Sequence, residues 1–495
     1  MAMFARYGPL ARLRTFGSIS CKNGRVQSSS RAFSTLFKRP TSAAMIKPRE
    51  FPHFTPSYPH FFYPSTFRIR PVTFTTSSTT QGSVADASLD SLPPNGVVRW
   101  LMLCCGLTFG VIVVGAVTRL TESGLSITEW KPVTGVIPPI GNEAWQAEFD
   151  KYRQTPEFKI LNSKMNVDEF KSIYYMEWGH RILGRVIGLA FAVPYGYYLF
   201  KRRLPAPLAG NLGALGLLLG AQGALGWYMV KSGLDHQTLV ENTPNPAQGI
   251  VPRVSQYRLA AHLGTALLFF SGALRTALTV RKDLQWASGG AVNGVGDQFV
   301  SLLQDPRVRR FKGASIALLL LAFGTAVSGA FVAGLDAGLI YNEFPYMGEG
   351  LVPPHNELLS PAYSRRSDQG DLWWRNMLEN PVTAQFDHRV LAMSTYFGTT
   401  GLYAVTRLTS LSSILPPLTR HLIGASFAMV NIQAALGITT LLYLVPVHLA
   451  ATHQAGSVFL LTTLIALVTS LRRPSKLASL VRAARQRAAP KVKPS

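Results

Sequence analysis

The chain has 495 residues, of which 47% are hydrophobic and only 15% are charged, and its formal net charge is +24. The apolar residues fall in long blocks, which indicates an integral membrane protein rather than a string of soluble domains. The positive charge gathers at the two ends and in short loops, so targeting and membrane topology account for it and a nucleic-acid-binding function is excluded. The three cysteines show no CxxC or zinc-ligand spacing and predict no disulfide framework.

Residues 1–80 are typical of a mitochondrial transit region followed by a linker. They are rich in Arg, Ser, Thr, Phe and Pro, and Glu50 is the only acidic residue before Asp86. A short apolar core with a small-residue cleavage site is lacking, which disfavours a secretory signal. The alternative interpretation is a disordered basic tail.

Eight apolar segments follow, each near the ~20 residues that a helix needs to cross a bilayer. They are expected at residues 98–118, 180–200, 207–230, 258–280, 312–334, 387–406, 419–441 and 448–471. Basic residues follow every second segment, whereas the long loop at 336–386 carries seven acidic residues against three arginines. The positive-inside rule then places the N- and C-termini on the same side, which is the matrix in a mitochondrial inner membrane.

The chain repeats itself in two halves. The first and fifth segments continue as Gly115-Ala-Val and Gly329-Ala-Phe, and the third and seventh contain Gln222-Gly-Ala-Leu-Gly226 and Gln433-Ala-Ala-Leu-Gly437. We therefore predict an all-α integral membrane protein with eight transmembrane helices in two pseudo-symmetric four-helix bundles. The expected parts after the transit region are an N-terminal bundle at 97–282, a matrix linker at 283–311, a C-terminal bundle at 312–472 and a basic matrix tail at 473–495.

Four histidines mark the even-numbered segments, and they are His180, His262, His388 and His453. Each precedes a basic residue beyond its segment by 19 or 21 residues, which is roughly 30 Å at ~1.5 Å per residue and equals one hydrocarbon thickness. All four are therefore expected near the membrane face opposite the basic side, one pair in each half. Two histidines on facing helices of a bundle are the usual axial ligands of haem iron, so each half is predicted to hold a haem. The alternatives are hydrogen-bonded core histidines, or zinc, which would need further ligands.

A carboxylate distinguishes the two halves. Glu177 lies one helical turn before His180 and on the same face, whereas neutral Gln385 takes the corresponding place in the second half. Glu177 is the candidate catalytic residue, able to relay a proton or to stabilise positive charge at a carbon being oxidised. The alternative is that Glu177 only pairs with Arg181 or Arg185. The candidate contacts to haem propionates are Arg181, Arg185 and Arg389.

Four motifs carry a resemblance to a known family, and they are Thr118-Arg-Leu-Thr-Glu-Ser-Gly-Leu-Ser126, Glu177-Trp-Gly-His-Arg-Ile-Leu-Gly-Arg185, Phe386-Asp-His-Arg389 and Thr452-His-Gln-Ala-Gly456. With these motifs, the stretch from about 97 to 472 resembles the mitochondrial form of the haem A synthase family. The resemblance implies an oxidoreductase that oxidises the C8 methyl group of haem O to the formyl group of haem A, the haem of cytochrome c oxidase. It implies haem O as the substrate on His180 and His262, and haem b, an iron cofactor, on His388 and His453.

The same resemblance implies partners. These are haem O synthase, which is a farnesyltransferase, a ferredoxin with its reductase as the electron source, and further copies of the chain in a homo-oligomer. Two other functions fit the same ligands. A dihaem electron carrier of the quinol-oxidising cytochrome b type usually places its haems near both membrane faces, which disagrees with four ligands at one depth. A haem transfer or assembly protein would need the histidines but not Glu177.

Overall fold

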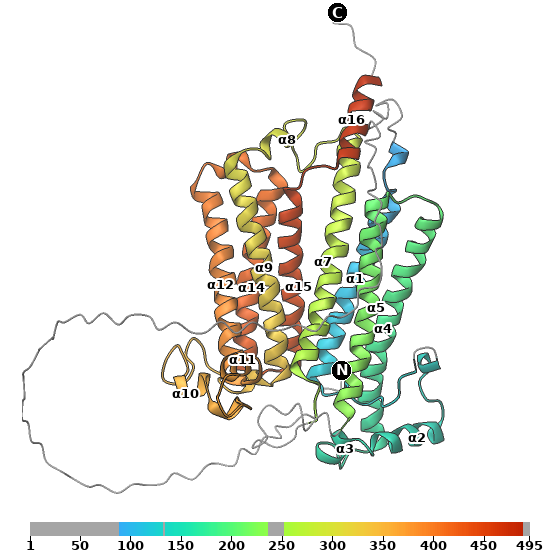
Figure 1. Cartoon of the computed structure of the whole chain (residues 1–495), viewed down its shortest axis with the longest axis vertical. Coiled ribbons are helices and arrows are strands. Elements are labelled where there is room, and N and C mark those ends of the chain that lie inside the picture. The colour runs from blue at the N-terminus through green and yellow to red at the C-terminus, as the bar shows by residue number, and fades with distance from the viewer. Residues whose placement is uncertain (1–88, 132–133, 236–251, 489–495) are drawn as a thin grey trace, which may run out of the picture. The chain divides into compact units, whose positions relative to one another are not determined.

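The structure is a computed structural model, and it describes residues 89–131, 134–235 and 252–488. The expected transit region at 1–80 lies outside these ranges. Eight long helices dominate the described residues (Figure 1): α1 (Asn95–Leu120), α4 (Val167–Phe200), α5 (Ala206–Leu234), α7 (Gln256–Ala287), α9 (Pro306–Gly334), α12 (Pro381–Leu408), α14 (Pro417–Leu442) and α15 (Val447–Ser470). Shorter helices join them: η2 (Leu89–Ser91), η3 (Thr134–Val136), α2 (Asn142–Tyr152), α3 (Pro156–Ile160), α8 (Phe299–Leu302), η5 (Ala337–Leu339), α10 (His355–Leu358), η6 (Pro361–Tyr363), α11 (Leu372–Glu379), α13 (Leu411–Ile414) and α16 (Lys476–Ala488).

The prediction of an all-helical membrane protein is confirmed. In the described part of the chain, seven helices are long and apolar enough to cross a membrane, namely all of the long helices except α12. Helix α12 is also long, but its first turns carry Gln385, Asp387 and Arg389, and such side chains lower its apolar character.

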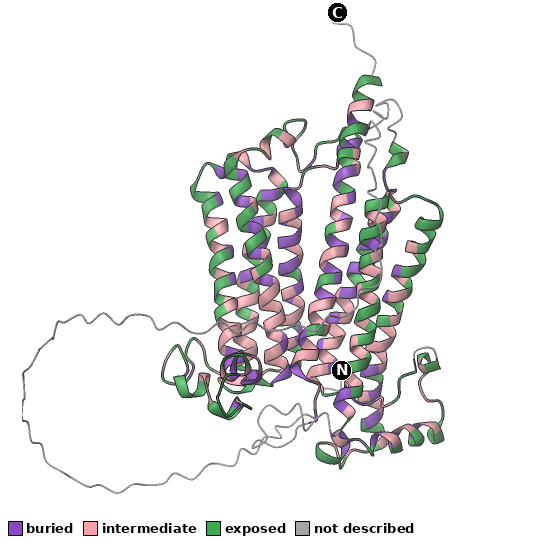
Figure 2. Cartoon of the chain, in the orientation of Figure 1, coloured by how far each residue is buried: buried purple, intermediate pink, exposed green. Residues whose placement is uncertain are grey.

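The long helices pack in a consistent pattern. Helix α1 contacts α4, α7 and α15, and α7 also contacts α5 and α9. Helices α9, α12, α14 and α15 contact one another in turn. The central helices α1, α7 and α15 bury 39%, 44% and 44% of their most apolar stretch, against 11% and 6% for α4 and α5. Exposed residues are accordingly frequent on the outer helices (Figure 2). Large apolar side chains such as Leu189, Leu217 and Phe397 are exposed, as lipid contact requires.

Helix α4 begins well before the predicted segment at 180–200. Asn166 accepts hydrogen bonds from the backbone N–H groups of Asp168 and Glu169, and the Glu169 carboxylate accepts one from the N–H of Asn166. This capping box fixes the start of the helix. The extra turns are buried beside the loop helices by aromatic packing that includes Phe170 and Tyr174. Hydropathy alone missed these turns because they pack against protein rather than lipid.

The basic C-terminal region is more ordered than the predicted tail at 473–495. Its residues 476–488 form α16, which packs against the end of α7. Arg482 stacks over the Trp286 ring at 4.1 Å and pairs with Asp297. Val481 shares a buried cluster with Leu92, which precedes α1. The start of the described chain and α16 therefore lie at the same end of the helices (Figure 1).

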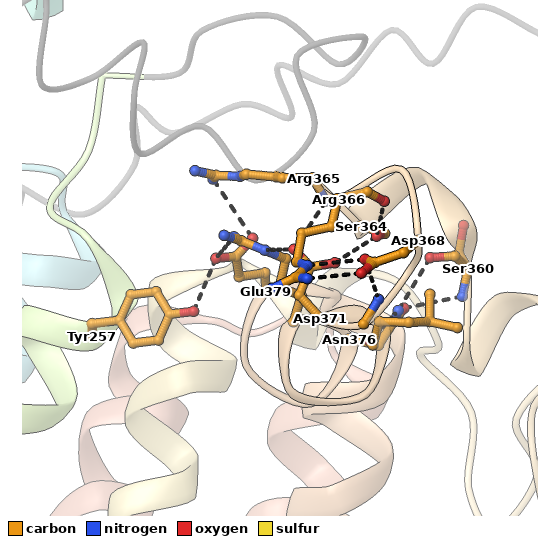
Figure 3. Close-up of polar contacts among 12 residues, drawn as sticks. Tyr257, Ser360, Ser364, Arg365, Arg366, Asp368, Asp371, Asn376 and Glu379 are labelled. Carbon is orange, nitrogen blue, oxygen red and sulfur yellow. Dashed lines mark hydrogen bonds and ion pairs between the residues drawn. The ribbon is translucent and has the colours of Figure 1, made fainter. Parts of the chain in front are cut away.

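Helices α10 and α11 of the acidic loop at 336–386 lie at the opposite end of the long helices (Figure 1). Polar contacts join its residues from Ser360 to Glu379 (Figure 3). Arg375 pairs with both Asp371 and Glu379, at 2.6 and 2.7 Å. A hydrogen bond from Ser364 is the main reason that the pKa of Asp371 lies below its ordinary range. Tyr257 on α7 donates to Glu379 at 2.9 Å, so this loop is tied to a helix of the first half. Three of its seven acidic residues, Asp368, Asp371 and Glu379, pair with arginines of the same loop.

Candidate functional site

The first predicted pair of histidines comes together in the structure. The ring centroids of His180 on α4 and His262 on α7 are 6.5 Å apart. An imidazole nitrogen bonds a metal ion at about 2.0–2.1 Å and lies about 1.1 Å from its ring centroid, so one ion between two imidazoles holds their centroids roughly 6.3 Å apart. The observed separation matches that value. In the second half, His388 lies on α12 and His453 on α15.

A glycine on a neighbouring helix lies against each of the four histidines. The contacts, each from the position of a glycine Cβ to the histidine Cε1 atom, are Gly115–His180 at 2.7 Å, Gly226–His262 at 3.2 Å, Gly329–His388 at 3.3 Å and Gly437–His453 at 2.9 Å. The contacts of Gly115 and Gly437 are under 3.0 Å, which real Cβ atoms essentially never show, so the imidazoles of His180 and His453 fit where they do because the glycine has no side chain. The contacts of Gly226 and Gly329 are tighter than most Cβ contacts. The predicted repeat therefore reappears as four equivalent glycine–histidine contacts.

Two glutamines extend this repeat. The side-chain amide of Gln222 on α5 donates to the backbone carbonyl of His262 at 2.9 Å, and that of Gln433 on α14 donates to the carbonyl of His453 at 2.7 Å. Each glutamine stands four residues before the glycine that contacts the same histidine. One helical face thus fixes both the backbone and the ring of its histidine.

The four imidazoles suit axial ligation of a haem. All four residues are half-buried, and among the described residues the Nδ1 atoms of His180, His262 and His453 are buried without a hydrogen-bond partner. Buried polar nitrogens without partners are uncommon in folded proteins. A bound metal ion would use an imidazole nitrogen, so these residues fit the axial ligands of a haem iron.

Glu177 is buried, with 3% of its surface exposed, and both carboxylate oxygens have partners. Oε1 accepts from Nε and Nη2 of Arg181 at 3.0 and 2.6 Å. Oε2 accepts from Ser126 Oγ at 2.7 Å and from the backbone N–H of Ile127 at 2.8 Å. The ion pair with Arg181 that the sequence left as an alternative is therefore present, and Glu177 also holds the loop after α1 over the histidine end of α4.

The second half repeats this arrangement without the charge. Arg181 donates to the carbonyl of Ile127, and Arg389 donates to the carbonyl of Tyr341 at the matching position. Gln385 replaces the carboxylate, donates to that same Tyr341 carbonyl at 3.1 Å and leaves its own Oε1 buried without a partner among the described residues. Both loops are thus anchored by an arginine, but the buried carboxylate at this position is present in the first half and replaced by Gln385 in the second.

Of the other predicted arginines, Arg185 donates to the Lys131 carbonyl at 3.0 Å. The three arginines therefore lie at the histidine ends of α4 and α12 and bind loop carbonyls. The Nε atom of Arg389 is a buried donor without a partner in the described structure.

A second buried carboxyl group lies near Glu177. Glu157 on α3 is 3% exposed, and burial together with the charge of Glu177 raises its pKa to about 8. This group is therefore protonated at neutral pH. It was not predicted, because Glu157 lies in a polar loop and no motif marks it.

The family described as cytochrome oxidase assembly protein (COX15-CtaA) matches residues 98–465. The chain belongs to this family. It is 44% identical over 383 residues to Heme A synthase COX15 of Saccharomyces cerevisiae, a match that covers 76% of each chain. It is 43% identical over 411 residues to Heme A synthase COX15 of Bos taurus, covering 82% of this chain and 90% of the bovine one. A Heme A synthase-mitochondrial ferredoxin fusion protein of Schizosaccharomyces pombe is 43% identical over 386 residues, with 77% of this chain and 61% of the fusion covered.

Membership of the COX15-CtaA family confirms the resemblance predicted from the four motifs. The matched range contains all four site histidines, Glu177 and Gln385. The glycines that contact the histidines were visible in the sequence only as repeat markers. Their contact with the imidazoles depends on the packing of neighbouring helices, which the sequence does not specify.

Proposed function

We propose that this protein is a haem A synthase, an oxidoreductase that converts the C8 methyl group of haem O into the formyl group of haem A for cytochrome c oxidase. The observation that carries the proposal is the pair His180–His262, whose ring centroids are 6.5 Å apart, a separation that one metal ion can span. Relatives named Heme A synthase, which this chain matches over most of their length, support it.

The proposed architecture is two four-helix bundles with α12 as an eighth membrane helix. The contacts support it, because α12 packs against α9 and α14 in the second half. Helix α12 also holds its histidine against a glycine of α9, as α4 does with α1. The proposed parts keep the predicted boundaries: a first bundle at 97–282, a linker at 283–311 and a second bundle at 312–472.

The two bundles are proposed to bind different haems. His180 and His262 hold the substrate haem O, and His388 and His453 hold haem b. When bound, haem b supplies an iron centre that accepts and passes on single electrons. The difference between Glu177 and Gln385 supports the assignment, since only the first bundle carries a buried anion one helical turn from a ligand.

In this proposal Glu177 contributes a fixed negative charge beside the reacting haem. Arg181, Ser126 and Ile127 hold its two oxygens in place, so the charge needs no rearrangement when positive charge develops nearby. The carboxyl of Glu157, whose pKa burial and the charge of Glu177 raise to about 8, is a protonated group close enough to Glu177 to interact with its charge. Arg181, Arg185 and Arg389 are proposed to meet haem propionates, with Nε of Arg389 as the donor that is still available.

The proposed location is the mitochondrial inner membrane, crossed several times, with the N- and C-termini in the matrix. The shared end of Leu92 and α16 supports termini on one side. A ferredoxin and its reductase are the proposed electron source, because one relative is a Heme A synthase-mitochondrial ferredoxin fusion protein. Haem O synthase and further copies of this chain are the other proposed partners.

Coexpression tests this proposal. The full chain is produced with a haem O synthase in a bacterium that makes no haem A, and membrane haems are separated by chromatography. Haem A is expected with the native chain and not with His180→Ala. Equal amounts of haem A, or none, in both strains would contradict the proposal.

A further inference from the structure

One hydroxyl group distinguishes His388, which contacts Gly329 of α9, from His180, which contacts Gly115 of α1. Ser328 on α9 lies 2.7 Å from Nδ1 of His388, and its Oγ donates to the backbone carbonyl of Thr325 at 2.8 Å. A hydroxyl has a single hydrogen. When that hydrogen is donated to Thr325, the Oγ atom accepts a hydrogen bond from the Nδ1–H tautomer of His388. In this arrangement Nε2 keeps the lone pair that binds a metal.

The first bundle has no such group. Ser328 precedes Gly329, which contacts His388, and the residue that precedes Gly115 in the same repeat is Val114. Valine has no hydrogen-bonding side chain, and Nδ1 of His180 is buried without a partner among the described residues. The two sites therefore share the glycine contact and differ in the support of the ligand nitrogen.

We propose that the Ser328–His388 hydrogen bond makes the second bundle the permanent haem site, and that Val114 keeps the first bundle exchangeable. The inference rests on the proposed function, in which one haem stays and the other is taken up and released. An acceptor on the remote ring nitrogen fixes the orientation of a ligating imidazole and raises its basicity, and loss of such a partner typically lowers metal affinity by 10–100-fold. A substrate ligand without this support releases its haem more readily.

Exchanging the two side chains tests the proposal on the purified full chain. Ser328→Val installs the side chain that the first bundle already accommodates at this position, so it is expected to fold. Ser328→Thr keeps the hydroxyl, and Val114→Ser adds one beside His180. Ser394→Val is the matched control, because Ser394 also donates to a carbonyl of its own helix but is exposed on α12. Two properties are measured: the rate at which haem passes to apomyoglobin and the midpoint potential of haem b.

Ser328→Val is expected to release haem b about 10–100-fold faster and to raise its midpoint potential, since a less basic ligand stabilises ferric iron less. Ser328→Thr and Ser394→Val should match the native chain. Val114→Ser should slow haem release from the first bundle, so that product haem stays on the purified protein. Unchanged release and potential in Ser328→Val, or equal changes in the Thr variant, would overturn the proposal. Haem b alone in the native chain would instead contradict the proposed function, while the Ser328 measurements would still report on the hydrogen bond.

Discussion

The contact between Gly115 and His180 gives the sharpest prediction. A Cβ atom at Gly115 would lie 2.7 Å from Cε1 of His180, and ordinary contacts begin at 3.4 Å. In Gly115→Ala the imidazole must therefore move by about 0.7 Å, and close-packed interiors resist such shifts. In Gly329→Ala the corresponding contact is 3.3 Å, so His388 needs to move by only about 0.1 Å.

Overpacking of this kind costs about 1–3 kcal/mol, which is roughly a 5- to 150-fold loss of affinity at tenfold per 1.4 kcal/mol. Gly115→Ala is therefore expected to lose haem from the first bundle, whereas Gly329→Ala should keep haem b. The assay is the amount and identity of haem per purified chain, from pyridine haemochrome spectra and mass detection.

Gly110→Ala is the matched control on the same helix, since a Cβ there meets no atom within 4 Å. It should keep all haem and gain about 0.5–1 kcal/mol of helix stability. Native haem content in Gly115→Ala, or equal losses in Gly115→Ala and Gly110→Ala, would refute the steric reasoning.

Three further predictions concern buried ionisable groups. Glu177→Gln should keep both haems but lower haem A yield by about 10²-fold or more, as loss of a preorganised electrostatic group does; normal yield in cells would reject the role of Glu177. Glu157→Gln should raise the melting temperature at pH 8 but not at pH 4, whereas exposed Glu143→Gln should change neither. The pKa of Glu157 is about 8 in the folded protein and 4.5 without burial, so the native chain loses stability as the pH rises from about 4.5 to about 8. A melting-temperature difference between Glu157→Gln and the native chain that does not change with pH would contradict this. Lys282→Met should lower the melting temperature, because Nζ donates to the Thr469 carbonyl at 2.5 Å and to the Ser470 and Arg472 carbonyls at and just beyond the end of α15. Thr469 and Ser470 keep hydrogen bonds from the Arg472 N–H and from Asn293, so the loss is that of the charge-assisted bonds, about 1.5–3 kcal/mol; an unchanged melting temperature would contradict this.

The sequence predicted most of the fold because membrane helices are long and their hydropathy is strong. The repeats around Gly115 and Gly329 and around Gln222 and Gln433 correctly indicated equivalent helices. The start of α4 was missed, because its outer turns pack on aromatic loop residues and are not apolar along their whole length. The helical form of residues 476–488 was missed for a similar reason. One face of this helix is buried, but it includes the basic residue Arg482, so it does not read as apolar in the sequence.

The site was predicted less completely than the fold. The structure brings His180 and His262 together as predicted, and it places Glu177 in an ion pair that spacing presented only as one of two alternatives. Ser328 carries no signal in a single sequence, because a serine in an apolar helix usually bonds only to its own backbone. Its role appears only when α9 and α12 are packed and the hydroxyl meets the ring of His388.

The most direct test of the central claim is to extract the haems from the purified native chain and identify them by chromatography with mass detection. The account predicts haem B together with haem O, a hydroxylated haem or haem A, since one bundle holds a cofactor and the other a substrate or its product. Haem B alone, at two per chain and reducible by quinol, would contradict the account and indicate a dihaem electron carrier.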